Sequence, residues 1–440
     1  MPELTLLIRG GTVVGPDDLT RGDVAVAGTE IVAVTESIDA PHGVRVLDAA
    51  GCLVGPGLVD LHTHLRQPGR EEAETIETGA RAAALGGYTA IVAMPNTEPA
   101  IDSAGVAAEV LALGAGCAAD VAVAGAITVG RAGHALAPLG ELAALGVTLF
   151  TDDGAGVQDG ALMRRALDYA LGLGVTLAQH CEDAGLAAGG AMHEGSWSSR
   201  LGIPGIPAAA EEAMVARDIA LVRLTGAPVH FLHMSTTGSV DLIRRAKEEG
   251  LPVTAEAAPH HMLLTHALVA GYDPVFKVNP PLRTDEDVAA VIAGLCDGTI
   301  DAVATDHAPH APESKDRPFD EAPPGMLGLQ TALPIAWEVL SPHLGPERVF
   351  ALLSAQPAVI AKLTATDPRR AGLSAQGGPV EVGAAANLCV FDPTATTVVD
   401  PAGLASRSRN TPYAGRTFAG AVRHTVLRGE AVVIDATAQR

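Results

Sequence analysis

The stretch "VDLHTH" (residues 59–64) is the first of eight apolar runs that alternate with alanine-rich stretches. The other seven runs lie at residues 89–96, 120–128, 146–153, 174–183, 228–235, 252–261 and 302–310. Apolar runs of this length, separated by helical stretches, are typical of βα units on a parallel sheet. Eight such units within about 250 residues predict an α/β fold, a (β/α)8 barrel of the TIM type.

The two ends of the chain have a different pattern from the middle. Residues 1–57 and 376–440 consist of short β-type runs separated by Gly, Pro and Asp turn residues. We expect the two ends to join in one small β-sandwich domain, with the barrel of residues 58–375 inserted between them. Two unrelated β-rich tails are the alternative, because sequence patterns specify topology weakly. Residues 311–326, "APESKDRPFDEAPPGM", predict a long loop after the eighth strand.

The composition limits the partners that the protein can have. The chain has 440 residues, with 29 Lys or Arg against 51 Asp or Glu, so its net charge is -22. This charge repels nucleic acid and anionic membrane surfaces, and we expect neither as a partner. No apolar run reaches the ~18 residues of a membrane span. Five scattered cysteines without a CxxC pair favour a reducing, cytoplasmic location.

Ligand-type side chains follow five of the eight predicted strands. In a barrel of this kind the active site lies at the carboxyl ends of the strands. The residues at those ends are His62 and His64, Asp152 and Asp153, His180, His233, and Asp306. Residues i and i+2 of a strand point to the same face, so His62 and His64 share a direction. Imidazole and carboxylate groups together suit Zn²⁺ or a similar divalent metal.

Each of these motifs also has a structural interpretation. An isolated His-x-His on a strand is more often a packed or hydrogen-bonded pair than a metal site. The same holds for a single histidine such as His180 or His233. Five independent strand ends that all carry ligand-type residues favour a metal site over coincidental packing. The sequence therefore predicts a bound metal at the mouth of the barrel.

Eight longer stretches carry a family pattern. They are "DLHTHLRQPG", "TIETGARAAALGGYT", "AMPNTEPA", "FTDDG", "HCED", "LHMST", "KVNPPLR" and "ATDHAPH", which span residues 60–310. The chain thereby resembles the amidohydrolase superfamily and, within it, the type I dihydroorotases. The resemblance implies a cyclic amidohydrolase with one or two Zn²⁺ per chain, two being expected. It implies the reversible cyclisation of N-carbamoyl-L-aspartate to (S)-dihydroorotate in pyrimidine biosynthesis.

The resemblance also implies which residues bind the metals. By position, it assigns His62, His64 and Asp306 to one ion, and His180 and His233 to the other. Asp306 would also be the catalytic residue. A carboxylate beside the attacking water can take its proton and pass it to the leaving ring nitrogen.

The residue shared by the two ions departs from a common superfamily pattern. Many relatives use a carboxylated lysine after the fourth strand, but this chain has no lysine before Lys247. The motif "TDDG" supplies aspartates instead, as in some dihydroorotases, and the resemblance points to Asp153. Strand alternation alone does not choose between Asp153 and Asp152.

A further set of residues resembles the substrate contacts of the family: His64, Arg66, Asn96, Asn279, His310, Pro324 and Gly325. Arg66 would share the side of the strand occupied by His64 if the extended geometry continued. A guanidinium there is a bidentate partner for a substrate carboxylate. An anionic substrate needs such a local positive group, because the net charge of the chain opposes its approach.

Two other functions share parts of this pattern. Hydantoinases and allantoinases have the expected fold and metals, but a hydantoin lacks the carboxylate that Arg66 would bind. An inactive family member that serves as a structural partner of aspartate carbamoyltransferase would lack metal ligands, and none is missing here. For the active enzyme we expect a small-molecule substrate and a homodimer. The resemblance also allows an association with aspartate carbamoyltransferase.

Overall fold

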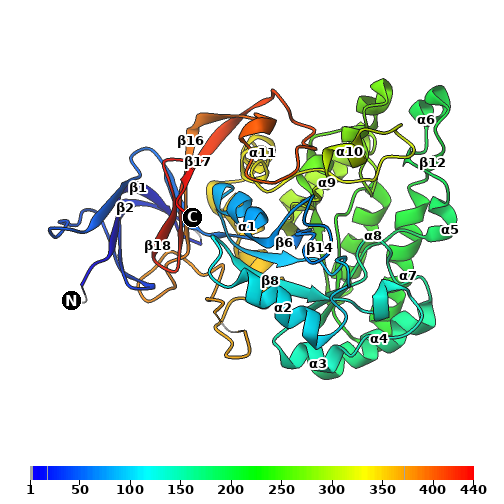
Figure 1. The fold of residues 1–440 in the computed structure, drawn as a ribbon, viewed down its shortest axis with the longest axis horizontal. Coiled ribbons are helices and arrows are strands. Elements are labelled where there is room, and N and C mark those ends of the chain that lie inside the picture. Colours follow the sequence, from blue (N-terminus) through cyan, green and yellow to red (C-terminus); the bar gives the residue numbers. More distant parts are fainter. Residues whose placement is uncertain (1–2, 17, 371) are drawn as a thin grey trace.

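The computed structural model describes residues 3–16, 18–370 and 372–440. A barrel of strands surrounded by helices lies beside a separate sheet (Figure 1). Strands from the first and last parts of the chain, blue and red, lie together in this sheet (Figure 1). Within the described residues, no helix is both long and apolar enough to cross a membrane.

Eight parallel strands form the barrel, and their order in the sheet follows the chain. They are β6 (Leu58–Thr63), β7 (Tyr88–Ala93), β8 (Asp120–Gly125), β9 (Leu149–Thr151), β10 (Thr176–Gln179), β13 (Val229–Phe231), β14 (Val253–Ala257) and β15 (Ala302–Val303). A parallel bridge between Thr63 and His307 joins the first strand to the segment after the last one and closes the barrel. Every residue of β6, β7 and β8 is buried, as expected for a sheet covered on both faces.

Helices lie between the barrel strands and after the last one, and several of them pack against the barrel. They are α1 (Ile76–Leu85), α2 (Ala104–Gly114), α3 (Leu139–Ala144), α4 (Gly160–Leu173), α5 (Ala184–Ala187), α6 (Ser196–Leu201), α7 (Ala209–Thr225), α8 (Thr237–Glu248), α9 (Asp285–Asp297), α10 (Pro312–Lys315), α11 (Ala332–Leu340), α12 (Pro346–Leu353) and α13 (Ala355–Ile360). Side-chain caps begin several of them; Thr75 accepts from the backbone of Thr78 at α1, and Asp159 from Leu162 at α4. Two short strands, β11 (Met192–His193) and β12 (Gly205–Ile206), pair with each other.

The other sheet has nine strands from both ends of the chain. They are β1 (Leu6–Val14), β2 (Leu19–Ala27), β3 (Glu30–Thr35), β4 (Arg45–Asp48), β5 (Leu53–Pro56), β16 (Leu388–Val398), β17 (Thr417–Leu427), β18 (Glu430–Ile434) and β19 (Thr437–Ala438). β5 pairs antiparallel with β16, with Val54 opposite Val390, so the two ends meet inside one sheet. The prediction of one composite β domain is confirmed, whereas the domain boundaries at residues 57 and 376 stay predictions.

All eight predicted barrel strands are present, but most are shorter than the apolar runs that predicted them. β9 has three residues and β15 has two. The ligand-type residues after them therefore lie in turns at the mouth of the barrel. Asp60 on β6 supports this region, because its carboxylate accepts hydrogen bonds from the Thr305 backbone N–H (2.7 Å) and hydroxyl (2.6 Å).

The predicted loop after the eighth strand contains the short helix α10 and is fastened to its surroundings. Lys315 Nζ donates to the backbone oxygens of Pro274 (3.0 Å) and Pro323 (2.8 Å). The first of these oxygens lies in the segment before Asn279, and the second lies near the far end of the loop. Lys315 thus holds two walls of the barrel mouth together.

Candidate active site

The carboxyl ends of five barrel strands bring six ligand-type side chains together. They lie at or just after the ends of β6, β9, β10, β13 and β15: His62, His64, Asp153, His180, His233 and Asp306. All six are buried, with exposed fractions of 5% or less. Burial of ionisable groups is costly unless each is paired or bound to a metal, so such a cluster indicates a functional site.

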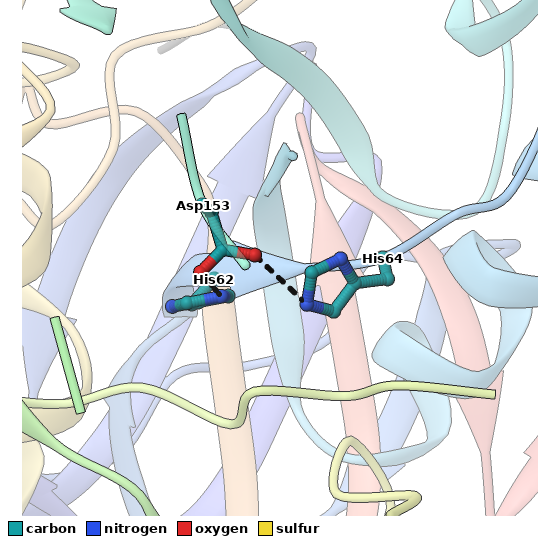
Figure 2. Close-up of side chains that lie close together, drawn as sticks. All are labelled: His62, His64 and Asp153. Atoms are coloured by element: carbon teal, nitrogen blue, oxygen red, sulfur yellow. Dashed lines mark ion pairs between the residues drawn. The ribbon is translucent and has the colours of Figure 1, made fainter. Parts of the chain in front are cut away.

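Asp153 lies at the centre of this histidine cluster. Its carboxylate oxygens are 3.4 Å from His62 Nε2 and 3.5 Å from His64 Nε2, the two contacts visible in Figure 2. Its Oδ1 also lies 3.4 Å from His180 Nδ1 and 3.6 Å from His233 Nε2. Two triads of possible ligands therefore share one carboxylate.

The neighbouring Asp152 makes different contacts. Its carboxylate accepts hydrogen bonds from the backbone N–H groups of Ile127 (2.8 Å) and Thr128 (3.0 Å), and from the Thr128 hydroxyl. These bonds tie the turn after β9 to the segment after β8. The geometry thus distinguishes the two aspartates that strand alternation left open: Asp153 faces the histidines, and Asp152 holds the turn.

Each histidine of the β6 pair has a hydrogen-bond acceptor for its outer nitrogen. His62 Nδ1 lies 2.8 Å from Glu256 Oε1 on β14, and His64 Nδ1 lies 2.8 Å from Asn96 Oδ1 after β7. Because these oxygens accept, each Nδ1 carries the ring proton. In the neutral rings, each Nε2 then directs an unshared electron pair toward Asp153. His62 Nε2 has no hydrogen-bond partner among the described residues.

The imidazoles determine the charge of the buried carboxylates. Burial raises the pKa of Glu256, but hydrogen bonds from His230 and His62 outweigh burial and bring it to about 2. Burial also raises the pKa of Asp153, yet the surrounding histidines, His62 foremost, lower it well below its ordinary value. For His62 the signs are reversed, because burial lowers its pKa while Asp153 raises it well above the ordinary value.

When the His62 ring is neutral, as metal binding requires, electron-rich atoms face one another. His62 Nε2 lies 3.4 Å from the Asp153 carboxylate and 3.6 Å from the Asp306 carboxylate. Such atoms repel unless a cation lies between them, either a proton on the imidazole or a metal ion. Imidazole and carboxylate donors without a thiolate match the preferences of Zn²⁺ and similar divalent metals. The histidine cluster is therefore compatible with a metal site.

Asp306 borders both the cluster and the open space above it. Its Oδ1 lies 3.2 Å from His64 Nε2, and its Oδ2 lies 3.9 Å from His260 Nε2. Burial raises the pKa of Asp306, but its close contact with the His64 imidazole and the nearby His62 lower it below the ordinary value. The carboxylate is therefore ionised at neutral pH and can accept a proton from a molecule in the pocket.

A pocket of about 250 Å³ opens above the cluster. Its walls contain every predicted site residue except the fully buried His62: His64, Arg66, Asn96, Asp153, His180, His233, Asn279, Asp306, His310, Pro324 and Gly325. The remaining wall residues were not singled out from the sequence: Arg70, Gly154, Val278, Ala308 and Pro323. The pocket therefore unites residues that lie up to 261 positions apart in the sequence, from His64 to Gly325.

Arg66 reaches the pocket by a route that the sequence did not predict. β6 ends at Thr63 and Arg66 has a φ of 61°, so the expected extended geometry does not continue, and the argument from a shared strand side was wrong. The chain turns instead, and Arg66 Nε donates to the backbone oxygen of Pro309 at 3.1 Å. Burial lowers the pKa of Arg66 to about 10, which leaves the guanidinium charged at neutral pH.

One wall of the pocket is formed by segments that pack too closely for larger residues. His310 Nε2 donates to the backbone oxygen of Pro324 at 2.8 Å. Burial, and then the charge of Arg66, lower the pKa of His310 to about 2, so this ring is neutral. Gly325 has a φ of 142°, and a Cβ there would lie 2.8 Å from both Ala308 Cβ and His310 Nε2. Only glycine fits this place.

Sequence reasoning missed the carboxylate that supports His62. The seventh strand was expected to contribute no ligand-type residue, and Glu256 belongs to no recognised motif there. Glu256 accepts from His62 and also from His230 Nε2 at 3.0 Å, so His230 supports the cluster indirectly. The available signal was a carboxylate inside an apolar strand, which is costly unless it is paired.

Comparison with known sequences identifies the family. A family model described as "Dihydro-orotase-like" matches residues 51–239. The dihydroorotase of Pelotomaculum thermopropionicum is 48% identical over 434 residues, which cover 98% of this chain and 99% of the relative. The dihydroorotase of Streptomyces coelicolor is 48% identical, covering 98% of this chain and 98% of the relative. The dihydroorotase of Mycobacterium tuberculosis is 47% identical, covering 98% of this chain and 99% of the relative.

Solved structures show the same architecture in other enzymes. L-hydantoinase from Arthrobacter aurescens has a TM-score of 0.86 and 24% identity, covering 100% of this chain and 98% of its own. Dihydropyrimidinase from Brevibacillus agri has a TM-score of 0.83 and 24% identity, covering 99% of this chain and 96% of its own. At such identity the likeness concerns the fold alone. The curated relatives are 47% to 48% identical over nearly the full length of the chain, which shows more than the fold. The chain belongs to the dihydroorotase family of the amidohydrolase superfamily.

Proposed function

We propose that this chain catalyses the reversible cyclisation of N-carbamoyl-L-aspartate to (S)-dihydroorotate and water, with Zn²⁺ bound in the histidine cluster. Membership of the family makes it a dihydroorotase, a cyclic amidohydrolase of pyrimidine biosynthesis. The observation that carries the finer proposal is the position of Asp153. Two pairs of histidines share this carboxylate at the base of a pocket that also contains Asp306 and Arg66.

Two Zn²⁺ ions per chain fit the division of the cluster into two triads. His62 and His64 would hold one ion with Asp306, His180 and His233 would hold the other, and Asp153 would be shared. Bound zinc polarises the amide carbonyl of the substrate and lowers the pKa of a water molecule. Asp153 carries the single negative charge that a carboxylated lysine has in other amidohydrolases, so activity should not depend on bicarbonate.

Asp306 would move the proton that the reaction requires. In ring opening, water adds to the ring carbonyl, the carbon–nitrogen bond breaks, and the nitrogen gains a proton. The ionised Asp306 carboxylate can accept the proton of the attacking water and deliver it to that nitrogen. In ring closure the carboxyl group begins protonated and the transfers reverse. Its place between His64 and the open pocket supports this role.

Arg66 would bind the carboxylate of the substrate. It is a buried cation of the pocket wall, and the overall charge of -22 makes a local cation necessary for an anionic substrate. Asn96, Asn279 and the neutral His310 line the same pocket and offer hydrogen bonds to a ring amide. The side-chain oxygen of Asn96 already accepts a hydrogen bond from His64 Nδ1, so its NH₂ group can donate to the substrate.

Hydantoin hydrolysis is the second candidate, because hydantoinases have the same fold. The test is to measure ring opening of dihydroorotate, hydantoin and allantoin with protein of known zinc content. We expect dihydroorotate to be the preferred substrate by kcat/KM, since it alone carries the carboxylate for Arg66. A preference for hydantoin or allantoin would contradict the proposed substrate.

The proposed assembly rests on the family resemblance, and the proposed location rests on the five scattered cysteines without a CxxC pair. We propose a cytoplasmic homodimer, and an association with aspartate carbamoyltransferase is compatible with it. Sedimentation of the purified chain, alone and with aspartate carbamoyltransferase, tests first the homodimer and second the association. A monomer at micromolar concentration would contradict the first, and separate boundaries in the mixture would contradict the second.

A further inference from the structure

One side chain from the C-terminal part of the sequence joins three residues of the substrate pocket. Asn410 Oδ1 accepts the backbone N–H of His310 at 3.1 Å. Its Nδ2 donates to the backbone oxygens of Ala308 at 2.9 Å and of Gly325 at 3.1 Å. Ala308, His310 and Gly325 all line the pocket, whereas Asn410 lies outside it. We call these three residues the tethered wall.

The chemistry of these contacts selects asparagine. The tethered wall presents one N–H and two carbonyl oxygens, and a carboxamide offers one acceptor and two donor hydrogens in a matching arrangement. An aspartate could accept from His310 but could not donate to either carbonyl. Asn410 is buried, with 6% of its surface exposed, so water does not readily replace the lost hydrogen bonds.

The segment that carries Asn410 is fixed by contacts of its own. Glu74 accepts a hydrogen bond from the Ser406 hydroxyl at 2.5 Å and from the Arg407 backbone N–H at 3.1 Å. The Ser408 hydroxyl donates to the backbone oxygen of Ala73 at 2.7 Å. These bonds hold the segment to the barrel just before α1. A change at Asn410 therefore acts on the tethered wall and leaves its own segment attached.

Asn410 adds to backbone contacts that already join the two segments of the tethered wall. The Ala308 N–H donates to the backbone oxygen of Met326 at 2.7 Å, and the Gly325 N–H donates to that of Lys277 at 2.9 Å. Ala308 and His310 lie in the turn after β15, and Gly325 lies at the far end of the loop that includes α10. Close packing of Gly325 against Ala308 and His310 means that a small shift of either segment changes the pocket. Asn410 contacts all three residues of the wall, so its side chain helps to set the distance between the two segments.

We propose that Asn410 is a positioning residue that sets the tethered wall for substrate binding. This inference rests on the proposed function, because the wall is argued to face the dihydroorotate ring. Asn410 contacts none of the histidine cluster, so its loss should leave zinc binding and the proton transfer at Asp306 intact. It should chiefly weaken the binding of substrate.

Asn387 supplies a matched control elsewhere in the molecule. It is also buried, with 5% exposed; its Oδ1 accepts the backbone N–H of Arg428 at 2.7 Å. Its Nδ2 donates to Ser374 Oγ at 2.9 Å and to the backbone oxygen of Ala375 at 2.8 Å. None of these partners lines the pocket. Asn387→Asp therefore removes a similar set of hydrogen bonds without touching the tethered wall.

The experiment compares wild type, Asn410→Asp, Asn410→Ala and Asn387→Asp. It measures zinc content, thermal unfolding, and KM and kcat for ring opening of dihydroorotate. Both Asn410 variants should keep their zinc and raise KM by about tenfold or more, with a smaller change in kcat. Asn387→Asp should lower the unfolding temperature without changing KM. An unchanged KM in the Asn410 variants, or an equal rise in all three, would overturn the proposal.

Hydrogen exchange gives a second readout that does not need turnover. Residues 308–326 should exchange faster in Asn410→Ala than in wild type, while residues 372–390 should do so only in Asn387→Asp. Equal protection of residues 308–326 in wild type and Asn410→Ala would contradict the positioning role. If wild-type protein itself fails to open dihydroorotate, the proposed function fails, whereas the exchange result still decides whether Asn410 holds the wall.

Discussion

The two sides of the histidine cluster differ in what holds their rings. On the β6 side, His62 and His64 each place Nδ1 2.8 Å from an acceptor oxygen, on Glu256 and Asn96. On the other side, His233 Nδ1 has no hydrogen-bond partner in the described part of the chain. His180 Nδ1 lies 3.0 Å from His233 Nε2, so these rings face each other without an outer acceptor for His233.

This difference predicts unequal metal binding. An acceptor on the outer nitrogen of a ligating histidine fixes its tautomer and orientation and raises its basicity. The His62 and His64 side should therefore hold its ion more tightly than the His180 and His233 side. Asp153 belongs to both sides, so its loss should weaken metal binding on both sides together.

The largest expected effect is that of Asp153→Ala. Removing the shared carboxylate should empty both sides and lower turnover by about 10⁴-fold or more, because zinc chemistry contributes several kcal/mol to the barrier. Elemental analysis and ring-opening rates measure the two effects. Asp152→Ala is the matched control, and it should keep zinc while lowering the unfolding temperature. The reverse pattern would show that Asp152 is the shared ligand.

Asp306→Asn should lower turnover in both directions by about 10²–10⁴-fold, the usual contribution of general acid–base catalysis. The variant keeps the size and one oxygen of the side chain but cannot accept a proton, so most zinc should remain. In wild type, ring opening needs the ionised carboxyl and ring closure the protonated one. Closure should therefore fall as pH rises, and opening should fall as pH decreases. If the rates in the two directions changed with pH in the same way, a group other than Asp306 would carry the proton.

Glu256→Gln should weaken zinc binding on the β6 side by about 10–100-fold, the usual effect of losing such a supporting hydrogen bond. Dialysis against a weak chelator should remove one equivalent before the other from wild type, and both together from the variant. Glu74→Gln is the control, because Glu74 is an equally buried carboxylate that pairs with His307 outside the cluster, at 3.2 Å. Identical zinc loss in the two variants would contradict the role of Glu256.

Arg66→Lys should have the smallest effect. Lysine keeps the charge but loses the planar fork that binds a carboxylate through two hydrogen bonds, so KM should rise about tenfold with little change in zinc content. Arg70→Lys at the pocket edge tests specificity, because Arg70 is half exposed and already paired with Glu98 at 2.7 Å. Equal changes in KM for both variants would remove the special role of Arg66.

The sequence predicted the barrel because its strands are buried on both faces and so appear as continuous apolar runs. It placed ligand-type residues at five strand ends because they lie at the ends of such runs, and the family resemblance pointed to Asp153. It could not choose between Asp152 and Asp153, because β9 ends at Thr151 and the following turn is oriented by backbone N–H groups of residues 127 and 128. Those contacts have no counterpart in the local pattern.

Residues that act through long-range contacts were the ones missed. Glu256 lies 194 positions from His62, and Asn410 lies 100 positions from His310. Neither pair shares a motif or a period, so only the folded chain brings the partners together. Arg66 was placed in the pocket by resemblance, but its route depends on a turn with positive φ that an arginine seldom adopts.

The most direct test of the central claim is to return zinc to the stripped protein while measuring ring opening of dihydroorotate. If the cluster is a two-metal site divided by Asp153, activity should be absent without metal, rise with added zinc and reach its maximum near two equivalents per chain. The first equivalent should bind more tightly than the second. Full turnover by protein that contains less than about a tenth of an equivalent of any divalent metal would contradict the account.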